Sequence, residues 1–185
     1  MVNSTNYRST QPATTFAISN VQIEVPAQQE ISTESKPTIS NVSGYPVQLE
    51  ISSLNVQSVI TEAQFNLNKN TWDVSDSNLN YIKEIPGEKP VDLLFTKNII
   101  IYGHNTKNLL GNLKNSKDDT VVKIYTSDGY EISYIYYQRI ITKPSDISIF
   151  HQEFKDPNLS IITCDGPFDS NRLIANFKLI DIKKR

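Results

Sequence analysis

Residues 159–173, LSIITCDGPFDSNRL, hold the only cysteine of this 185-residue chain and an arginine shortly after it. The run LSII is apolar and β-branched, which predicts a buried strand that ends at Thr163 and Cys164. The residues DGPFDSN are typical of a tight connection. A second apolar strand is then predicted to begin at Arg172. Two antiparallel strands joined by so short a loop bring Cys164 and Arg172 close together.

Composition narrows the class of protein. Hydrophobic residues make up 38% of the chain and charged residues 21%, with a net charge of −2. This balance predicts one globular domain and argues against nucleic-acid or anionic-membrane binding through bulk charge. A single cysteine excludes an intrachain disulfide. Because no CxxC motif or histidine cluster occurs, we expect no metal site and no cofactor.

No run of about 18 apolar residues occurs, so we expect a soluble chain without a membrane span. The N-terminus also lacks a signal-peptide pattern and reads as the inside of a longer, anchored protein. Residues 1–43 are rich in Ser, Thr, Asn and Gln, which predicts a flexible polar spacer. Weak alternation in FAISNVQIEVPA, residues 16–27, leaves a strand possible there, but we do not expect this segment to cover Cys164. The domain is predicted to span residues 44–185.

The rest of the domain reads as strands with only short helices. Besides the two strands around Cys164, strands are predicted at PVQLEI (46–51), NVQSVI (55–60), IIIY (99–102), VVKIY (121–125) and YEISYIYYQRII (130–141). SDG at 127–129 predicts a hairpin turn, and PGEKP at 86–90 a plain turn. Short helices are predicted at 77–85, around Leu109 to Leu113, and after Ser145. About eight strands predict an all-β fold closed into a barrel.

Histidine and arginine side chains can activate a cysteine nucleophile. The chemistry needs a base or cation that favours the thiolate, a proton donor for the leaving group, and donors for the oxyanion. Cys164, His104 at the end of the IIIY strand, and Arg172 can supply these roles. Each also has an ordinary explanation as a buried thiol, a turn histidine or a surface charge. His151 competes as the base but lies in a less regular segment.

Taken together, these residues resemble the sortases, cysteine transpeptidases of bacterial surfaces. The family motif TLxTC is matched by SIITC, residues 160–164, with two substitutions. Its small-residue-His motif is matched by Gly103 and His104, and its arginine by Arg172 in NRLI. The resemblance covers residues 46–183. Similar residues also occur upstream, at Trp72, at Pro86-Gly87 and at Asn98.

The resemblance implies an eight-stranded barrel and a two-step acyl transfer. Cys164 is expected to attack an LPxTG-like sorting signal of a protein substrate, with His104 as acid and then base. Arg172 is expected to hold the oxyanion or the signal's backbone, and Thr163 and Asn105 to bind substrate. The acceptor is an amine of a peptidoglycan precursor or a pilin lysine, at the extracellular face of the membrane. The segment at 140–158 is expected to recognise the signal.

Two other classes of protein are alternatives to a sortase. An L,D-transpeptidase carries a Ser-x-Gly-Cys run with an arginine two residues after the cysteine, which this sequence does not match. The alternative that stays open is a non-catalytic β-barrel adhesin or pilus module with a structural cysteine. Calcium binding is not expected, because Asp118, Asp119 and Glu131 read as turn and surface charges. A thiol that alkylating reagents cannot reach favours the binding module.

Overall fold

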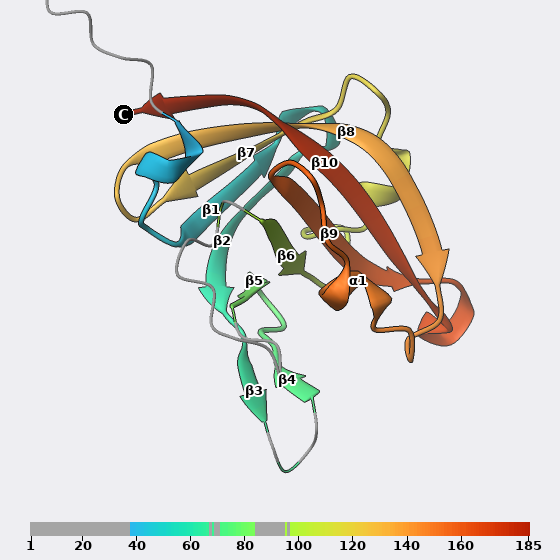
Figure 1. The fold of residues 1–185 in the computed structure, drawn as a ribbon. Helices are drawn as coiled ribbons and strands as arrows, with labels where there is room; N and C mark the ends of the chain where they lie inside the picture. Colours follow the sequence, from blue (N-terminus) through green and yellow to red (C-terminus); the bar gives the residue numbers. More distant parts are fainter. Residues whose placement is uncertain (1–37, 67, 69–70, 84–94, 96) are drawn as a thin grey trace, which may run out of the picture. The chain divides into compact units, whose positions relative to one another are not determined.

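The computed structural model describes residues 38–66, 68, 71–83, 95 and 97–185. Within these ranges, eight strands close into a barrel and two more form a separate hairpin (Figure 1). The barrel strands are β1 (Pro46–Ile51), β2 (Val56–Glu62), β5 (Leu79–Ile82), β6 (Asn98–Tyr102), β7 (Val121–Thr126), β8 (Tyr130–Thr142), β9 (Asn158–Asp165) and β10 (Asn171–Lys184). The prediction of an all-β, eight-stranded closed barrel with few helices is confirmed.

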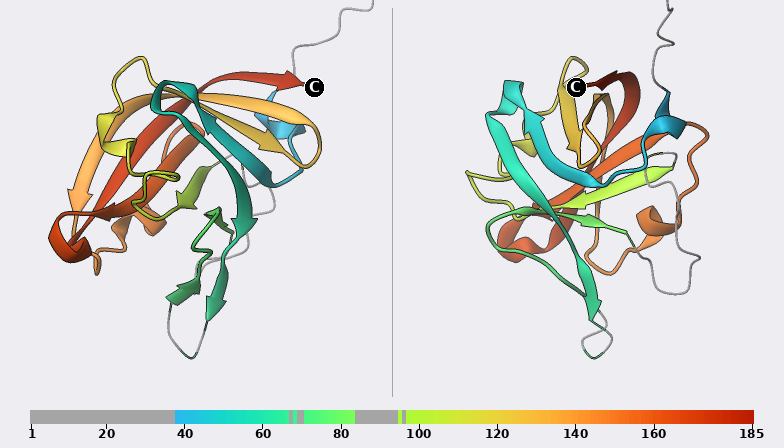
Figure 2. Two further views of the ribbon diagram at one scale, coloured as in Figure 1. Left: turned by 180° about the vertical axis from the view of Figure 1, so that it is seen from behind. Right: turned by 90° about the vertical axis from the view of Figure 1, so that its left-hand side faces the viewer.

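The strand order of the barrel is β1-β2-β5-β6-β9-β10-β8-β7, and β7 pairs back onto β1. Two neighbouring pairs, β2 with β5 and β6 with β9, are parallel, whereas the others are antiparallel. The long strands β8 and β10 are paired over most of their length and form one part of the barrel wall. The rear view shows them side by side (Figure 2). Strand β9 therefore lies between β6 and β10, which determines the neighbours of Cys164.

Side-chain alternation along the strands separates two hydrophobic clusters. The barrel core holds the large buried side chains Tyr134 and Phe177, together with Leu159 and Ile161 of β9. The second cluster lies on the opposite face of the sheet. Its members are Ile162, Ile100 and Ile174 from the central strands, with Ala63, Ile82 and Ile149, and Trp72, Val74, Tyr102, Ile140, Phe150 and Phe154 packed around them. Because both faces of β9 are covered, seven of its eight residues are buried.

One predicted helix is wrong. Residues 79–82, placed in a helix at 77–85, form strand β5, and all four side chains are buried. The strand pairs with β2 on one side and β6 on the other, and these long-range pairings outweigh the local helical pattern. The turn before β5 is organised by Ser75, whose Oγ accepts hydrogen bonds from the amides of Ser77 and Asn78.

The other helical segments are short. Leu109, Leu110 and Leu113 are buried in the barrel core, but they lie in successive turns that end in the 3₁₀ helix η4 (Leu113–Asn115). The remaining 3₁₀ helices are η1 (Ile39–Asn41), η2 (Ser52–Leu54) and η5 (Pro167–Asp169). The single helical turn expected after Ser145 is α1 (Ser148–His151). Its first amide is bound by Asp146, not Ser145.

The hairpin formed by β3 (Gln64–Asn66) and β4 (Thr71–Asp73) extends from the end of β2 (Figure 1). It was not predicted, because its strands are three residues long and mostly polar. At the start of the described chain, Val42 is already buried in the barrel core. The segment at 16–27 where a strand is possible, most of the predicted spacer and the turn at 86–90 lie outside the described residues.

Candidate active site

Cys164 lies near the end of β9 on the face of the sheet opposite to the barrel core. Leu159 and Ile161 point into the core, and alternation places Ile162 and Cys164 on the other face. The side chain is 7% exposed. The thiol therefore lies at the end of the second hydrophobic cluster.

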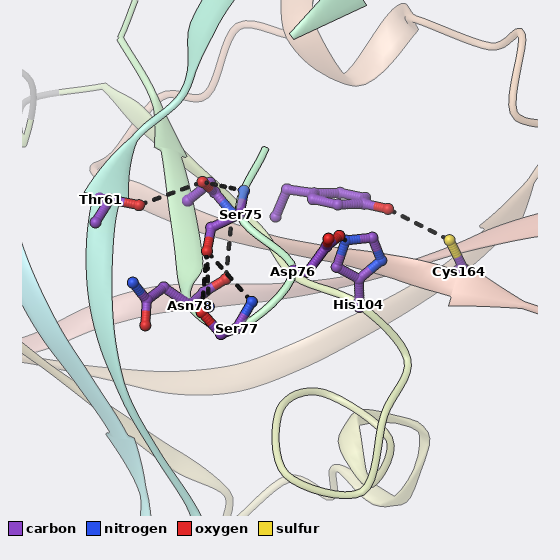
Figure 3. Close-up of polar contacts among 9 residues, drawn as sticks. Thr61, Ser75, Asp76, Ser77, Asn78, His104 and Cys164 are labelled. Carbon is purple, nitrogen blue, oxygen red and sulfur yellow. Dashed lines mark hydrogen bonds and ion pairs between the residues drawn. The ribbon is translucent and has the colours of Figure 1, made fainter. Parts of the chain in front are cut away.

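Strand register brings two further side chains to this face. Arg172 of β10 is directly opposite Cys164 in the antiparallel ladder, so the two side chains leave the sheet in the same direction. Tyr102 of β6 is level with Ile162 in the parallel ladder. The Tyr102 hydroxyl reaches Cys164, with 3.4 Å between Oη and Sγ, drawn as a dashed line to the sulfur in Figure 3.

Tyr102 keeps its proton across the physiological pH range. Burial raises the pKa of its phenol, and the hydrogen bond to Cys164 and the negative charge of the thiolate raise it further. Arg172 acts in the opposite direction but with a smaller effect. Because a phenol O–H is a stronger donor than a thiol S–H, we assign Tyr102 as the donor and the sulfur as the acceptor.

Gly103 lets the chain leave the barrel wall directly before His104. Its amide donates to the carbonyl of Ile162 at 3.1 Å, which continues the ladder by one bond. A Cβ at this position would lie 2.4 Å from Leu79 Cδ2 and 2.9 Å from Leu110 Cδ1. The close packing explains the small residue and places His104 at the rim of the sheet.

His104 faces Asp76 from the turn before β5. Its Nε2 lies 3.3 Å from Asp76 Oδ1, while the ring packs edge-on to Tyr102 with centroids 5.7 Å apart. Nε2 nevertheless makes no hydrogen bond within the described part of the chain, although it is shielded from solvent. The contact is therefore an ion pair only while the imidazole is protonated, and it is misaligned as a hydrogen bond.

The position of Asp76 is held by a polar network around Ser75 (Figure 3). The Ser75 amide donates to Asn80 Oδ1 at 3.1 Å, and the Thr61 hydroxyl donates to the same oxygen at 3.3 Å. Asn80 is buried at 1% exposure, so this anchor is rigid. The Asp76 carboxylate itself is fully exposed, and solvent screens its attraction to His104.

Arg172 is attached to the connection between β9 and β10. Its Nη1 donates to the carbonyls of Asp169 at 3.1 Å and Asn171 at 3.0 Å. In this connection Phe168 and Asp169 have positive φ angles of 55° and 56°, and the Phe168 side chain is fully exposed. Positive φ is unusual for residues other than glycine. The loop therefore has an unusual backbone that presents its carbonyls to Arg172.

A pocket of about 310 Å³ opens at this point. It is lined by Asp76, His104, Asn105, Thr106, Cys164 and Asp169. Three of the predicted site residues, His104, Asn105 and Cys164, thus share one cavity. Arg172 is the register neighbour of Cys164, whereas His151 lies in α1 and is not among the lining residues.

Thr163 differs from the other predicted residues. It is level with Leu173, a residue of the barrel core, and points away from the face that carries Cys164. Its Oγ1 is buried and has no hydrogen-bond partner among the described residues. A contact between Thr163 and a substrate at Cys164 is therefore limited to its main chain.

Sequence reasoning missed Tyr102 and Asp76. Tyr102 directly precedes Gly103 and shares the alternation that puts Cys164 on the second face, which was a usable signal once the parallel register of β6 and β9 was known. Asp76 occurs in an ordinary polar turn, SDSN. Nothing in that local sequence indicates a position beside His104.

The sequence and the fold of this chain are similar to those of known proteins. The sequence model of the sortase domain matches residues 49–180, which is more than half of the chain. The chain belongs to the sortase family. Sortases are transpeptidases that act on proteins with sorting signals at the bacterial cell surface. The predicted resemblance is therefore confirmed.

Solved sortase structures share the fold of this sortase. Sortase A from Listeria monocytogenes matches with a TM-score of 0.58 and 16% identity, over 78% of this chain and 92% of that chain. Sortase C-3 from Streptococcus pneumoniae gives 0.59 and 18%, over 78% and 67%. The sortase D5 transpeptidase from Clostridium perfringens gives 0.55 and 24%, over 74% and 79%. A search of curated protein sequences gave no significant match. In the described part of this sortase, no helix has the length and apolar character to cross a membrane.

Proposed function

We propose that this sortase cleaves an LPxTG-like sorting signal through a thioacyl intermediate on Cys164. The observation that carries the proposal is a pocket that both Cys164 and His104 line, with Arg172 opposite Cys164 in the β-ladder. A nucleophile, a proton carrier and a cation within one site are the requirements of acyl transfer by a thiol. Family membership independently supports a transpeptidase.

In the first half-reaction, the Cys164 thiolate attacks the carbonyl carbon of the signal's threonine. An S–C bond forms and the carbonyl π electrons move to the oxygen. When this intermediate collapses, the C–N bond to the next residue breaks, and the leaving amine takes a proton from the His104 imidazolium. The acyl fragment remains on the enzyme as a thioester.

In the second half-reaction, an amine attacks the thioester and gives a proton to neutral His104. The S–C bond breaks, the new amide is released, and the thiolate is regenerated. We assign the acceptor amine to a peptidoglycan precursor or a pilin lysine. Either carries a primary amine, and its unprotonated form is the nucleophile of this step.

Arg172 is assigned to the oxyanion or to the backbone of the signal. The guanidinium has five N–H donors in a planar fork. Nη1 donates both of the hydrogen bonds to the carbonyls of Asp169 and Asn171. Asn105, which is exposed at the rim of the pocket, is assigned to substrate binding. Thr163 contributes in this proposal through its main chain only.

The proposed site of action is the extracellular face of the bacterial membrane. Most of residues 1–43 are proposed as a polar spacer that separates a membrane anchor from the catalytic domain, whose core already includes Val42. Their composition, rich in Ser, Thr, Asn and Gln with few charges, is the support for this assignment.

Intact-mass spectrometry tests the proposed function. The wild type is incubated with a panel of LPxTG-type peptides, followed by triglycine. We expect an adduct equal in mass to the N-terminal acyl fragment, which triglycine removes. Cys164→Ala should form no adduct. An adduct on Cys164→Ala, or an unreactive thiol and no adduct with any peptide, would contradict the proposal and favour a structural cysteine.

The chain offers a matched control for the histidine, because it contains only two. We expect His104→Ala to lose at least about 100-fold in the rate of acyl transfer, the usual range for a general acid–base residue. His151 lies in the segment expected to recognise the signal, so any loss in His151→Ala should be smaller and should appear in KM rather than in the rate at saturating peptide. Equal losses in the two variants would contradict the assignment of His104.

A further inference from the structure

The Tyr102 hydroxyl lies 3.4 Å from the Cys164 sulfur, within hydrogen-bond distance. The contact joins two strands that are 62 residues apart in the chain. It is possible because Tyr102 is level with Ile162 in the parallel ladder, one alternation step from Cys164. The hydroxyl therefore approaches the sulfur from β6, whereas Arg172 approaches from β10.

The ring of Tyr102 is fixed by its packing, so the hydroxyl is preorganised. The ring packs against the second hydrophobic cluster, which includes Ile100 and Ile162. The His104 imidazole packs against it edge-on, at an interplanar angle of 79°. A donor held in this way needs little reorganisation when charge develops beside it.

We propose that Tyr102 is a catalytic residue of this sortase, whose hydroxyl donates a hydrogen bond to the Cys164 thiolate and then to the developing oxyanion. The inference rests on the proposed thioacyl chemistry of Cys164. It assigns to the phenol a role that neither the sequence motif nor the family match specifies.

The same hydroxyl can serve both steps because the two acceptors are close together. In the free enzyme the negative charge is on Sγ. When the S–C bond forms, the charge moves to the carbonyl oxygen of the tetrahedral intermediate, which is two bonds from the sulfur, and the sulfur, now bonded to carbon, becomes a poor acceptor. The hydroxyl then turns from sulfur to oxygen. It keeps its proton throughout, and the proton of the leaving amine still comes from His104.

Four other ionisable groups surround this contact and must be considered in any pH profile. His104 and Asp76 lie on the side of β6 and the turn before β5. Arg172 and Asp169 act on Tyr102 from β10 and the preceding loop. Arg172 favours the thiolate, whereas the two carboxylates oppose it. A tyrosine variant leaves all four groups in place, so a change in the profile can be assigned to the hydroxyl.

The first test is Tyr102→Phe, which keeps the ring and removes only the hydroxyl. Iodoacetamide alkylation of Cys164 is followed as a function of pH, and acyl-enzyme formation is followed at saturating peptide. We expect the alkylation midpoint to rise by about one pH unit and the acylation rate to fall about tenfold, with little change in KM. Tyr125→Phe is the matched control, because its hydroxyl binds Glu50 in β1. It should change neither quantity.

A second variant separates catalysis from packing. Tyr102→3-fluorotyrosine keeps the shape of the ring and makes the hydroxyl a stronger donor, so the alkylation midpoint should move to lower pH. Opposite shifts in the two variants support the proposal, and unchanged midpoints and acylation rates overturn it. Alkylation does not require a sorting signal. If the wild type forms no acyl-enzyme but the two variants still shift the alkylation midpoint in opposite directions, the proposed function is contradicted. The hydrogen bond from Tyr102 to the thiolate is then still supported.

Discussion

Side-chain direction at Cys164 follows from the alternation of β9. The thiol shares its face with Tyr102 and Arg172, whereas the adjacent Thr163 points into the barrel. Cys164, His104, Asn105 and Arg172 could be selected from the sequence because each occurs at the end or start of a strongly apolar strand. Tyr102 could not, because its contact depends on the register between β6 and β9. The register pairs Tyr102 with Ile162. These residues are distant in sequence, and neither strand alone determines the pairing.

Asp76 is expected to contribute only weakly beside His104. The carboxylate is fully exposed and makes no aligned hydrogen bond to Nε2, and exposed ion pairs contribute at most about 1 kcal/mol. Asp76→Asn should therefore lower kcat/KM for peptide cleavage by less than about fivefold. Steady-state kinetics at low and high salt measure the effect.

The exposed Asp118 gives the matched control. Asp118→Asn removes the same charge from a turn remote from the pocket and should leave kcat/KM unchanged. A loss of 100-fold or more in Asp76→Asn would contradict this expectation and indicate a Cys-His-Asp triad.

At the scale of elements, the strands with clear alternation were predictable, and the short elements around the site were not. Strand β5 has a helical local pattern, yet it pairs with two strands that are distant in sequence. The β3–β4 hairpin is too short and too polar for a strand signal. Both elements depend on tertiary contacts, which outweigh weak local propensity.

The β3–β4 hairpin and α1 support each other through an aromatic stack. Trp72 of β4 packs on Phe150 of α1 with ring centroids 4.9 Å apart, and Phe65 of β3 packs edge-on to Trp72 at 5.2 Å. The helix lies in the segment expected to recognise the sorting signal. The hairpin, which the sequence did not predict, thus helps to position that segment over the second hydrophobic cluster.

A double-mutant cycle measures this support. Trp72→Ala, Phe150→Ala and the double variant are unfolded with urea, and we expect a coupling free energy of about 0.5 to 1.5 kcal/mol. Phe168→Ala is the control, because this fully exposed ring should contribute almost nothing to stability. Additive losses in the cycle would show that the hairpin and α1 do not support each other.

At the scale of the whole barrel, Asp128 joins segments from both ends of the described chain. Its Oδ2 accepts hydrogen bonds from the amides of Ser43 and Gly44, each at 2.9 Å. Its carbonyl accepts one from Lys184 Nζ at 2.6 Å. The β7–β8 turn is thereby attached to the residues before β1 and to the end of β10.

The stability of the protein should depend on pH through the ionisation of Asp128. Burial opposes its ionisation, but the hydrogen bonds from Thr126, Ser43 and Gly44 outweigh burial and lower the pKa of Asp128. Its contribution is therefore complete above the ordinary Asp pKa, about 3.9, and is lost as the pH falls through the lower folded-state value.

We expect Asp128→Asn to lower the free energy of unfolding at pH 7 by at most about 1 kcal/mol, since solvent screens this partly exposed group. The difference from wild type should shrink as the pH falls below the ordinary Asp pKa, about 3.9, and vanish below the lower folded-state pKa. Urea unfolding between pH 7 and 2.5 measures it, with Asp118→Asn as the reference. A difference that stays constant over this range would show that the ionised form is not responsible.

The parallel contact between β6 and β9 also has a kinetic consequence. The chain must close a loop of about 60 residues before Tyr102 meets Cys164, and contacts between residues so far apart in sequence form slowly. A newly synthesised or partly unfolded chain therefore carries Cys164 as an ordinary thiol. Its special surroundings arise only when β6 pairs with β9, so the rate at which the thiol acquires its native reactivity reports the formation of that pairing.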